Sequence, residues 1–312
     1  MIYYSPCAHY RLVASIDLSD IRWGTSVIPR FAGTFDGNEM TISHLTINGA
    51  GYLGLFGRLE SGAQVKDIGV LDVNISSSDF YVGALAGSNG GNVTSCYSTG
   101  AVMGYRAVVG LLGYNGGAVS HCYSSADVGR TEPSRIVDSR LGHGGLVGCN
   151  IGDVTHSFST GSVIGASTVG GLAGSNDGSI IMSYSTGMVR GESSIGGLVG
   201  NNSQLVQGCY STGAVNGESG VGGLVGSNIS SYIFREGMGK GIVTQSFWDI
   251  DISGQTTSAG GAGKTTDEMQ TASTFLDAGW DFVDETANGT EDIWWIDEGQ
   301  DYPHLCWEEI EQ

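Results

Sequence analysis

The segment Gly144-Gly145-Leu146-Val147-Gly148 decides the fold, because close copies of it recur along the chain. With the leucine of each copy taken as an anchor, the six anchors are Leu85, Leu111, Leu146, Leu172, Leu198 and Leu224. They are separated by 26, 35, 26, 26 and 26 residues, so one insertion of nine interrupts a strict period. A fixed period of this length is the signature of a repeat architecture, in which each repeat is one structural unit.

Four further columns of residues keep a constant spacing from the anchor. The fourth residue after it is Asn, at Asn89, Asn115, Asn150, Asn176, Asn202 and Asn228. The eighth is β-branched, at Val93, Val119, Val154, Ile180 and Val206, and the twelfth is aromatic, at Tyr97, Tyr123, Phe158, Tyr184 and Tyr210. The seventeenth is Val102, Val128, Val163, Val189 or Val215. In the sixth unit an insertion of 11 delays the equivalent positions to Val243 and Phe247.

Each repeat offers three short β-rich pieces separated by Gly and Asn turns, and no piece can bury its own apolar side. Stacking the copies at the ~4.8 Å strand spacing pairs the backbone of each coil with its neighbours and places like residues on like. The spacing therefore predicts an all-β fold, a parallel β-solenoid of about eight coils of 26 residues. Because parallel crossovers prefer the right hand, we expect a right-handed solenoid. We also expect the Asn column to form an inward amide ladder, with glycines beside it supplying turns of positive φ.

The repeat divides the chain into three parts. Residues 1–50 read as one or more degenerate N-terminal coils, and residues 51–249 as the regular solenoid, with insertions at 129–141 and 230–240. Residues 250–312 depart from the pattern and are rich in acidic and aromatic residues. Thr265 followed by acids predicts a helix start, and Trp280–Phe282 and Ile293–Ile296 read as strands. We expect this segment to be a small mixed cap over the apolar edge of the last coil.

The charge excludes one class of partner. The chain has a formal net charge of −19 and a pI near 4.4, so its surface repels phosphate backbones and nucleic acid is not expected to bind. Between Asp249 and Gln312, 16 acidic residues stand against one base, Lys264. No run of 18 apolar residues is present, so no membrane span is expected. No signal peptide is visible at the N-terminus, and we expect the chain either to begin after one or to be part of a longer protein.

The repeats resemble the GLUG motif, which is named for the Gly-Leu-x-Gly core that recurs here six times. The resemblance covers about residues 31–250. It implies a β-solenoid region of an exported bacterial protein, secreted or on the cell surface, as in adhesins and in non-catalytic regions of immunoglobulin-A peptidases. It transfers no catalytic residue, because the motif is structural. The His-Glu-x-x-His zinc signature of those peptidases is absent from the sequence.

One stretch has the spacing of a cation loop. Asp249, Asp251 and Ser253 place oxygen atoms at alternate positions before Gly254, as in the first half of a Ca²⁺ loop. Gly260 stands where an EF-hand needs its bidentate Glu, so another acid would have to complete the site. The sequence leaves two interpretations open, a Ca²⁺ site with Ca²⁺ as cofactor and an ordinary turn.

Three histidines are the best-located candidates for chemistry. His121 and His156 both lie ten residues after their anchors, so the stack should place them one strand spacing apart on one face. His143 occupies a column that is otherwise β-branched, directly after the insertion that carries Asp138. Paired imidazoles with a nearby carboxylate could serve acid–base or metal-assisted hydrolysis. The alternative is surface histidines and a salt bridge within the loop.

Two functions are compatible with these features. The first is a surface adhesion or glycan-binding module of an exported bacterial protein, to which the Tyr column, if it faces outward, could offer rings for carbohydrate to stack on. The second is a Ca²⁺-dependent hydrolase or lyase on the solenoid, acting on a polysaccharide or a small ester or lactone. If the chain is an enzyme, it is expected to be a metal-dependent hydrolase. The partner is then a glycan or a small molecule in either case.

Overall fold

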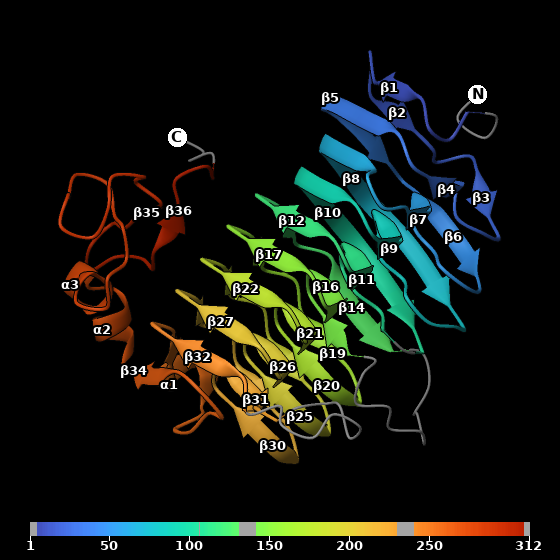
Figure 1. The fold of residues 1–312 in the computed structure, drawn as a ribbon. Helices are drawn as coiled ribbons and strands as arrows, with labels where there is room; N and C mark the ends of the chain where they lie inside the picture. The colour runs from blue at the N-terminus through green and yellow to red at the C-terminus, as the bar shows by residue number, and fades with distance from the viewer. Residues whose placement is uncertain (1–4, 106, 131–141, 230–239, 309–312) are drawn as a thin grey trace.

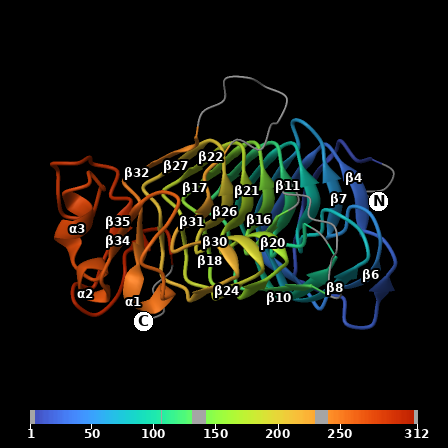
Figure 2. The same ribbon diagram turned by 90° about the horizontal axis from the view of Figure 1, so that it is seen from below.

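The chain folds as a parallel β-solenoid, as the period predicts. The computed structural model describes residues 5–105, 107–130, 142–229 and 240–308. Figures 1 and 2 show the coils stacked in chain order, with the N-terminal coil at one end and the C-terminal segment at the other. Within the described ranges, no helix has the length and apolar character needed to span a bilayer.

The largest sheet wraps around more than one side of every coil and is parallel throughout. Its strands β5, β8 and β10 are long and continuous, and the others are short pieces. It contains β1 (His9–Arg11), β2 (Ile16–Asp17), β3 (Arg22–Trp23), β5 (Thr34–Ser43), β6 (Thr46–Gly49), β8 (Gln64–Ser77), β10 (Asn92–Gly104), β12 (Ala118–Ser120), β13 (Tyr123–Ser124), β14 (Asp127–Arg130), β17 (Asp153–Thr155), β18 (Phe158–Ser159), β19 (Val163–Ile164), β22 (Ser179–Ile181), β23 (Tyr184–Ser185), β24 (Val189–Arg190), β27 (Leu205–Gln207), β28 (Tyr210–Ser211), β29 (Val215–Asn216), β32 (Ile242–Thr244), β33 (Phe247–Asp249) and β34 (Ala262–Lys264).

Two further parallel sheets close the coils, and the C-terminal segment adds three helices and one antiparallel pair. The second sheet contains β4 (Ile28–Phe31), β7 (Phe56–Leu59), β9 (Ala86–Asn89), β11 (Leu112–Asn115), β16 (Val147–Asn150), β21 (Ala173–Asn176), β26 (Val199–Asn202) and β31 (Val225–Ser227). The third contains β15 (His143–Gly144), β20 (Ser167–Gly170), β25 (Ser193–Gly196) and β30 (Ser219–Gly222). The C-terminal elements are α1 (Ile250–Ser253), α2 (Thr266–Met269), α3 (Ala272–Leu276) and the antiparallel pair β35 (Trp294–Trp295) and β36 (His304–Leu305).

Neighbouring coils are in register at the period read from the sequence. The Leu146 N–H donates to the carbonyl of Leu172, and the Leu172 N–H donates to that of Leu198, both at 2.9 Å. The anchor leucines and the Val columns point inward and form one continuous core along the solenoid axis. Burial of like residues on like in every coil therefore stabilises the stack.

The Asn column forms the inward amide ladder that the sequence predicts. Asn150 Nδ2 donates to Asn176 Oδ1 at 2.8 Å and to the carbonyl oxygen of Gly152 at 3.1 Å. The same side-chain contact links each pair from Asn89 to Asn228. Because these amides are buried, the ladder satisfies turn carbonyl groups that water cannot reach.

The expectation that glycines beside this ladder supply positive φ is wrong. Gly117 and Gly152 are absent from the left-handed region, and a Cβ atom at either would lie 1.9 or 2.0 Å from a carbonyl oxygen of the preceding coil. These glycines permit close approach of coils. The left-handed corner lies instead ten residues after the anchor, at Ser95 (φ 51°), His121 (54°), His156 (48°), Met182 (49°) and Gly208 (61°). In the sixth unit the insertion of 11 delays it to Gln245 (51°).

The C-terminal segment first extends the last coil and then packs against the side of the solenoid. β34 pairs in parallel with β33, and Thr265 begins α2 with a capping box to Glu268, as the sequence predicts for that helix start. Of the two strands expected beyond it, Trp294–Trp295 forms one, and Phe282 contributes a single bridge to Trp294. The aromatic residues of this segment cluster with the Tyr column, so the cap covers a lateral face as well as the last coil.

Candidate functional site

The aromatic column forms a stacked ladder on the outside of the solenoid. The rings of Tyr97, Tyr123, Phe158, Tyr184 and Tyr210 have centroids 4.8–4.9 Å apart and planes within 4–7° of parallel. Tyr123, Phe158, Tyr184 and Tyr210 belong to a hydrophobic cluster that is separate from the interior core. We refer to these five residues as the aromatic ladder.

The outward direction of the ladder follows from the alternation of side chains along a strand. Each ladder residue is followed by a buried Ser, and Ser98 Oγ donates to the carbonyl of Gly110 at 2.9 Å inside the coil. The aromatic side chain one residue earlier must then point outward. The parallel register of successive coils places each ring directly on the next, at the strand spacing.

The C-terminal segment covers the ladder unevenly. Tyr210 donates from its hydroxyl to the carbonyl of Pro303 at 2.5 Å, and Tyr184 donates to Glu308 Oε2 at 2.8 Å. Trp294 packs against both rings, at 6.1 and 6.3 Å. Burial raises the pKa of both tyrosine hydroxyls well above the usual value, so they stay protonated donors.

Toward the N-terminal end the ladder is more open. Phe158 is still buried, whereas Tyr123 and Tyr97 are only half-buried. Trp307 lies beside this part, with its ring 5.6 Å from Phe158 and 6.4 Å from Tyr123 and tilted by 31° and 34°. The open part of the ladder, Tyr97 and Tyr123 with Trp307, is therefore a half-exposed aromatic surface where the cap ends.

Two stacked imidazoles lie next to this surface. His121 and His156 have ring centroids 5.2 Å apart and planes 10° from parallel, and Trp307 contacts His121 edge-on at 5.6 Å. The predicted placement of the pair on one face of adjacent coils is confirmed. Both occupy the left-handed corner between two strands, which turns their side chains to the outside.

Burial favours the neutral form of both imidazoles. It lowers the pKa of His121 below its usual value, and it lowers that of His156, where the positive charge of His121 adds to the effect and Glu291 opposes it. Two adjacent imidazolium ions would also repel each other. Near neutral pH the pair therefore presents neutral rings, each with one donor and one acceptor nitrogen.

The structure separates His143 from this pair. His143 lies in β15, where it pairs with Val169 of β20, and its side chain is buried in the interior rather than on the outer face. Neither ring nitrogen has a hydrogen-bond partner in the described part of the chain. The expectation that the three histidines act together is therefore wrong, because the column of His143 points inward. Asp138 lies outside the described residues, as does most of each insertion.

The predicted cation loop is arranged as a helix cap. Asp249 is buried, and its Oδ1 accepts the N–H groups of Asp251 and Ile252 at the start of α1. Its Oδ2 accepts hydroxyl groups from Thr266 and Tyr302, at 2.8 and 2.7 Å. Ser253 is the last residue of α1 and accepts the N–H of Gln255. Within the described ranges, no three His, Cys, Asp or Glu side chains gather as a metal site.

Sequence reasoning did not single out Trp307, which completes the open part of the ladder. It lies 184 residues beyond Tyr123, so no periodic pattern links the two. Sequence reasoning also missed a second external aromatic group, because its two tyrosines hold no shared column in the repeat. The rings of Tyr52 and Tyr81 stack at 5.5 Å, and the Arg58 guanidinium lies 3.9 Å from the centroid of Tyr52.

The fold and the repeat define a parallel β-solenoid with a lateral aromatic ladder, and comparison with known proteins confirms the resemblance to the GLUG motif. Residues 78–103 match the family described as the GLUG motif. The chain is 38% identical over 90 residues to Halomucin of Haloquadratum walsbyi, a match that covers 26% of this chain and 1% of that protein. It is 40% identical over 79 residues to a protein of Evansella cellulosilytica named as a candidate Gly-rich membrane protein, covering 25% and 8%.

The fold also resembles a solved structure. A crystal structure from Bacteroides ovatus, named as a candidate immunoglobulin A1 protease, aligns with a TM-score of 0.55 over 98% of this chain and 88% of that one. The sequences are 16% identical, so the likeness shows the fold alone. The two matched stretches span only 1% and 8% of the curated relatives.

Proposed function

We propose that this chain is a glycan-binding adhesion module of an exported bacterial protein, and that it binds glycans at the open part of the aromatic ladder. The observation that carries the proposal is the uneven cover of the ladder. The cap buries Tyr184 and Tyr210 but leaves Tyr97 and Tyr123 half-buried beside two neutral imidazoles. The name of the Evansella relative, which places that protein in a membrane, supports a role at the cell surface.

The chemistry of the surface suits a hydroxyl-rich ligand. A glycan offers hydroxyl groups that can donate and accept, and His121 and His156 each provide both functions when neutral. Thr94 and Ser120, whose hydroxyl oxygens lie 3.3 Å apart, add hydroxyl groups three residues before Tyr97 and Tyr123. The ligand is expected to be neutral, because a chain of net charge −19 repels polyanions.

The geometry limits how a sugar ring can pack. The ladder rings stack on one another, so their edges and hydroxyl groups, rather than their faces, point outward. Trp307 is tilted from them and supplies a surface in a different plane. We therefore propose that a sugar lies across the ring edges of Tyr97 and Tyr123 and packs against Trp307, with imidazole hydrogen bonds fixing its orientation.

The test is glycan binding by isothermal titration calorimetry, with neutral oligosaccharides chosen from an array screen. Tyr123→Ala and His121→Ala should each weaken binding by tenfold or more, and Tyr52→Ala in the second aromatic group is the matched control that should leave it unchanged. Thermal unfolding of each variant distinguishes a lost contact from a lost fold. The proposal is wrong if no neutral glycan binds, or if Tyr52→Ala weakens binding as much as Tyr123→Ala.

A hydrolysis screen distinguishes this function from the enzymatic one. Wild-type protein and the His121→Ala, His156→Ala double variant are incubated with polysaccharides and small esters, with and without a chelator. A binding module gives no turnover in any of these reactions. Turnover that the double variant loses would replace the binding proposal with a hydrolase.

A further inference from the structure

The left-handed corner that carries the two imidazoles continues into the coils that precede them. One coil before His121 the corner residue is Ser95 (φ 51°), and one coil before that it is Asp67 (φ 54°). The residues on either side of the corner pair in parallel from coil to coil, so these corners lie one strand spacing apart. Asp67, Ser95, His121 and His156 therefore form one row of polar side chains along the solenoid, which we call the polar row.

The aromatic ladder beside this row ends at Gly69. This glycine takes the ladder position one coil before Tyr97. A Cβ atom at Gly69 would lie 2.4 Å from Cζ of Tyr97, so the tyrosine ring itself covers the position. The polar row goes one coil further than the ladder, because Asp67 lies beside Gly69. The surface therefore changes from aromatic to charged within one coil of Tyr97.

The C-terminal segment covers the polar row at its other end. Gln245, the corner residue of the sixth unit, donates from Nε2 to the carbonyl of Ala278 at 2.6 Å and accepts the indole N–H of Trp280 at 2.9 Å. In the other direction Ser95 is exposed and Asp67 is half-buried. The row is therefore open over the same coils as the ladder.

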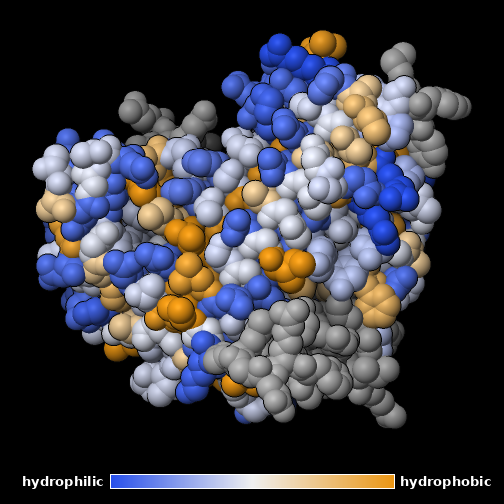
Figure 3. All heavy atoms as spheres, in the orientation of Figure 1, coloured by the Kyte–Doolittle hydropathy of each residue, from blue (hydrophilic) through white to orange (hydrophobic). Residues whose placement is uncertain are grey.

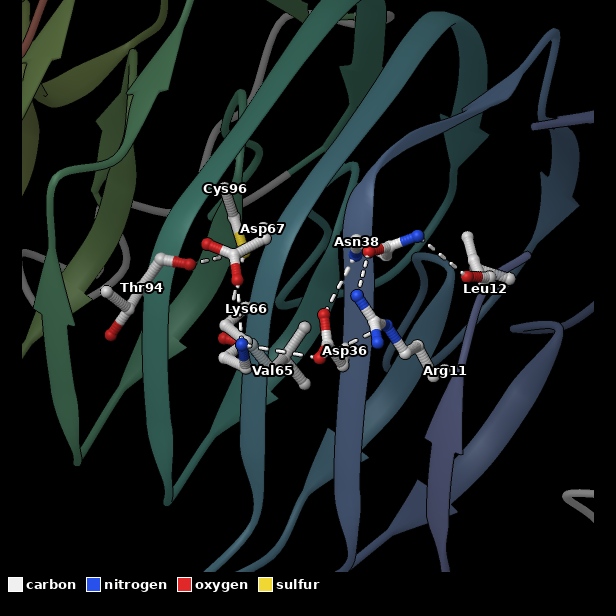
Figure 4. Close-up of polar contacts among 9 residues, drawn as sticks. All are labelled: Arg11, Leu12, Asp36, Asn38, Val65, Lys66, Asp67, Thr94 and Cys96. Atoms are coloured by element: carbon white, nitrogen blue, oxygen red, sulfur yellow. Dashed lines mark hydrogen bonds and ion pairs between the residues drawn. The ribbon is translucent and has the colours of Figure 1, made fainter. Parts of the chain in front are cut away.

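Lys66 holds the carboxylate of Asp67 in place by one of its two oxygens. In Figure 4, Lys66 lies between Asp67 and Asp36, with its Nζ 2.8 Å from Asp67 Oδ2 and 3.3 Å from Asp36 Oδ2. Among the described residues, none forms a hydrogen bond to Asp67 Oδ1, and the side chain is 32% exposed. A carboxylate oxygen in this position can accept a hydrogen bond from a ligand hydroxyl group.

The length of the polar row suits a chain of sugars. From Asp67 to His156 it crosses three strand spacings, roughly 14 Å, which accommodates about three sugar residues of an extended chain. Figure 3 shows hydrophilic residues gathered on the coils of β5 and β8, away from the C-terminal segment. The surface in that direction therefore favours a ligand rich in hydroxyl groups.

Backbone pairing offers no competing way to bind here. β8 pairs with β5 on one edge and with β10 on the other, and β10 pairs with β8 and with β12, β13 and β14. A peptide that adds a strand needs a free edge, and these coils present none on this side. Recognition therefore depends on side chains.

We propose that the ligand is a linear, neutral, β-1,4-linked glycan that lies along the solenoid axis, with Asp67 as the specificity-determining residue. The inference rests on the proposed function, since one sugar occupies the open part of the aromatic ladder beside His121. The extended chain carries hydroxyl groups along its edges, so the next sugars meet Ser95 and then Asp67. The Asp67 carboxylate accepts a hydroxyl group of a neutral sugar and repels the carboxylate of a uronic acid.

The test is isothermal titration calorimetry with β-1,4-linked oligosaccharides of glucose, mannose and N-acetylglucosamine, each in lengths of one to five residues. In at least one series, affinity should rise tenfold or more from one residue to three and level off in the longer chains. The trisaccharide of the uronic acid with the same linkage should bind at least tenfold more weakly than the neutral one.

Two matched variants separate a specific role of Asp67 from a change in net charge. Asp67→Gly removes the carboxylate without backbone strain, because glycine readily adopts φ 54°. It should weaken trisaccharide binding tenfold or more, leave disaccharide binding unchanged and narrow the preference for the neutral trisaccharide over the uronic one. Asp72→Gly removes a carboxylate from the next left-handed corner of the same coil (φ 49°) and should bind every probe as wild type does. Thermal unfolding of both variants checks the fold.

Three results would overturn this inference: an affinity independent of chain length, equal losses in Asp67→Gly and Asp72→Gly, or binding confined to glycans of other linkages. If Tyr123→Ala still weakens neutral glycan binding in any of these cases, the proposed function stands without it. If no neutral glycan binds, both are wrong.

Discussion

Replacing His143 by Val should stabilise the protein, and by more in acid than at neutral pH. The imidazole lies at an inward position that is β-branched in the neighbouring coils, where it faces Val169, and its ring packs over Gly165. Neither nitrogen has a partner among the described residues. An unsatisfied buried polar group costs about 1–3 kcal/mol, so the His143→Val variant gains stability at pH 7 even where the new side chain adds no contact.

The larger stability gain in acid follows from the linkage between protonation of His143 and folding. Burial, and secondarily the positive charge of Arg130, lowers the pKa of His143 from 6.5 to about 4. Because the folded pKa is below the unfolded one, the unfolded chain takes up the proton first, and the wild-type protein loses stability as pH falls from 6.5 toward 4. At 1.36 kcal/mol per pKa unit, the loss amounts to about 3 kcal/mol at pH 4.

The assay is urea unfolding of the wild-type chain and the His143→Val variant at pH 7 and pH 4. The difference between the two proteins at each pH cancels the titration of groups that they share. It should widen by about 3 kcal/mol from pH 7 to pH 4. A difference that is the same at both values, or a variant less stable than wild type at both, would refute the placement of this ring in the core.

Two further predictions concern the C-terminal segment. Asp249→Asn should lower the free energy of unfolding by about 1–2 kcal/mol, because the carboxylate caps α1 and accepts hydrogen bonds from the hydroxyl groups of Thr266 and Tyr302. Adding Ca²⁺ or a chelator should leave the melting temperature of the wild-type protein unchanged. A rise in that temperature with Ca²⁺ would instead support the cation site. Hydrogen bonding to Glu308, opposed by burial, raises the pKa of His304, so its stabilising contribution is fully present below pH 6.5 and is lost as pH rises through the raised pKa. The decline in wild-type melting temperature between pH 6 and pH 8 should be smaller in His304→Gln; an equal decline in both proteins would contradict this role.

The regular part of the fold could be predicted because each residue in a solenoid contacts its counterpart one period away. Leu146 and Leu172 carry that relation in the sequence itself, and their backbones bond in the structure. The same rule placed His121 against His156. Where contacts repeat with the period of the chain, the sequence determines which residues meet.

The open part of the ladder could not be predicted, because its contacts have no period. Trp307 reaches Tyr123 through a segment that folds back along the solenoid, and nothing in the repeat specifies where that segment packs. The direction of a column is also ambiguous from spacing alone: His143 occupies an otherwise β-branched column, and the structure shows that this column points inward. Asp249 was ambiguous for a chemical reason, since a helix cap and a cation loop both begin with a carboxylate in a turn.

Nitration of tyrosine, mapped by mass spectrometry, tests the central claim most directly. The claim is that the chain stacks in register to form an external ladder whose C-terminal rungs lie under residues 280–308. The expected result is modification of Tyr97 and Tyr123 in the native protein, with Tyr184 and Tyr210 protected until it unfolds. Equal reactivity of all four rings, or protection of Tyr97 and Tyr123 with Tyr184 and Tyr210 modified, would contradict it.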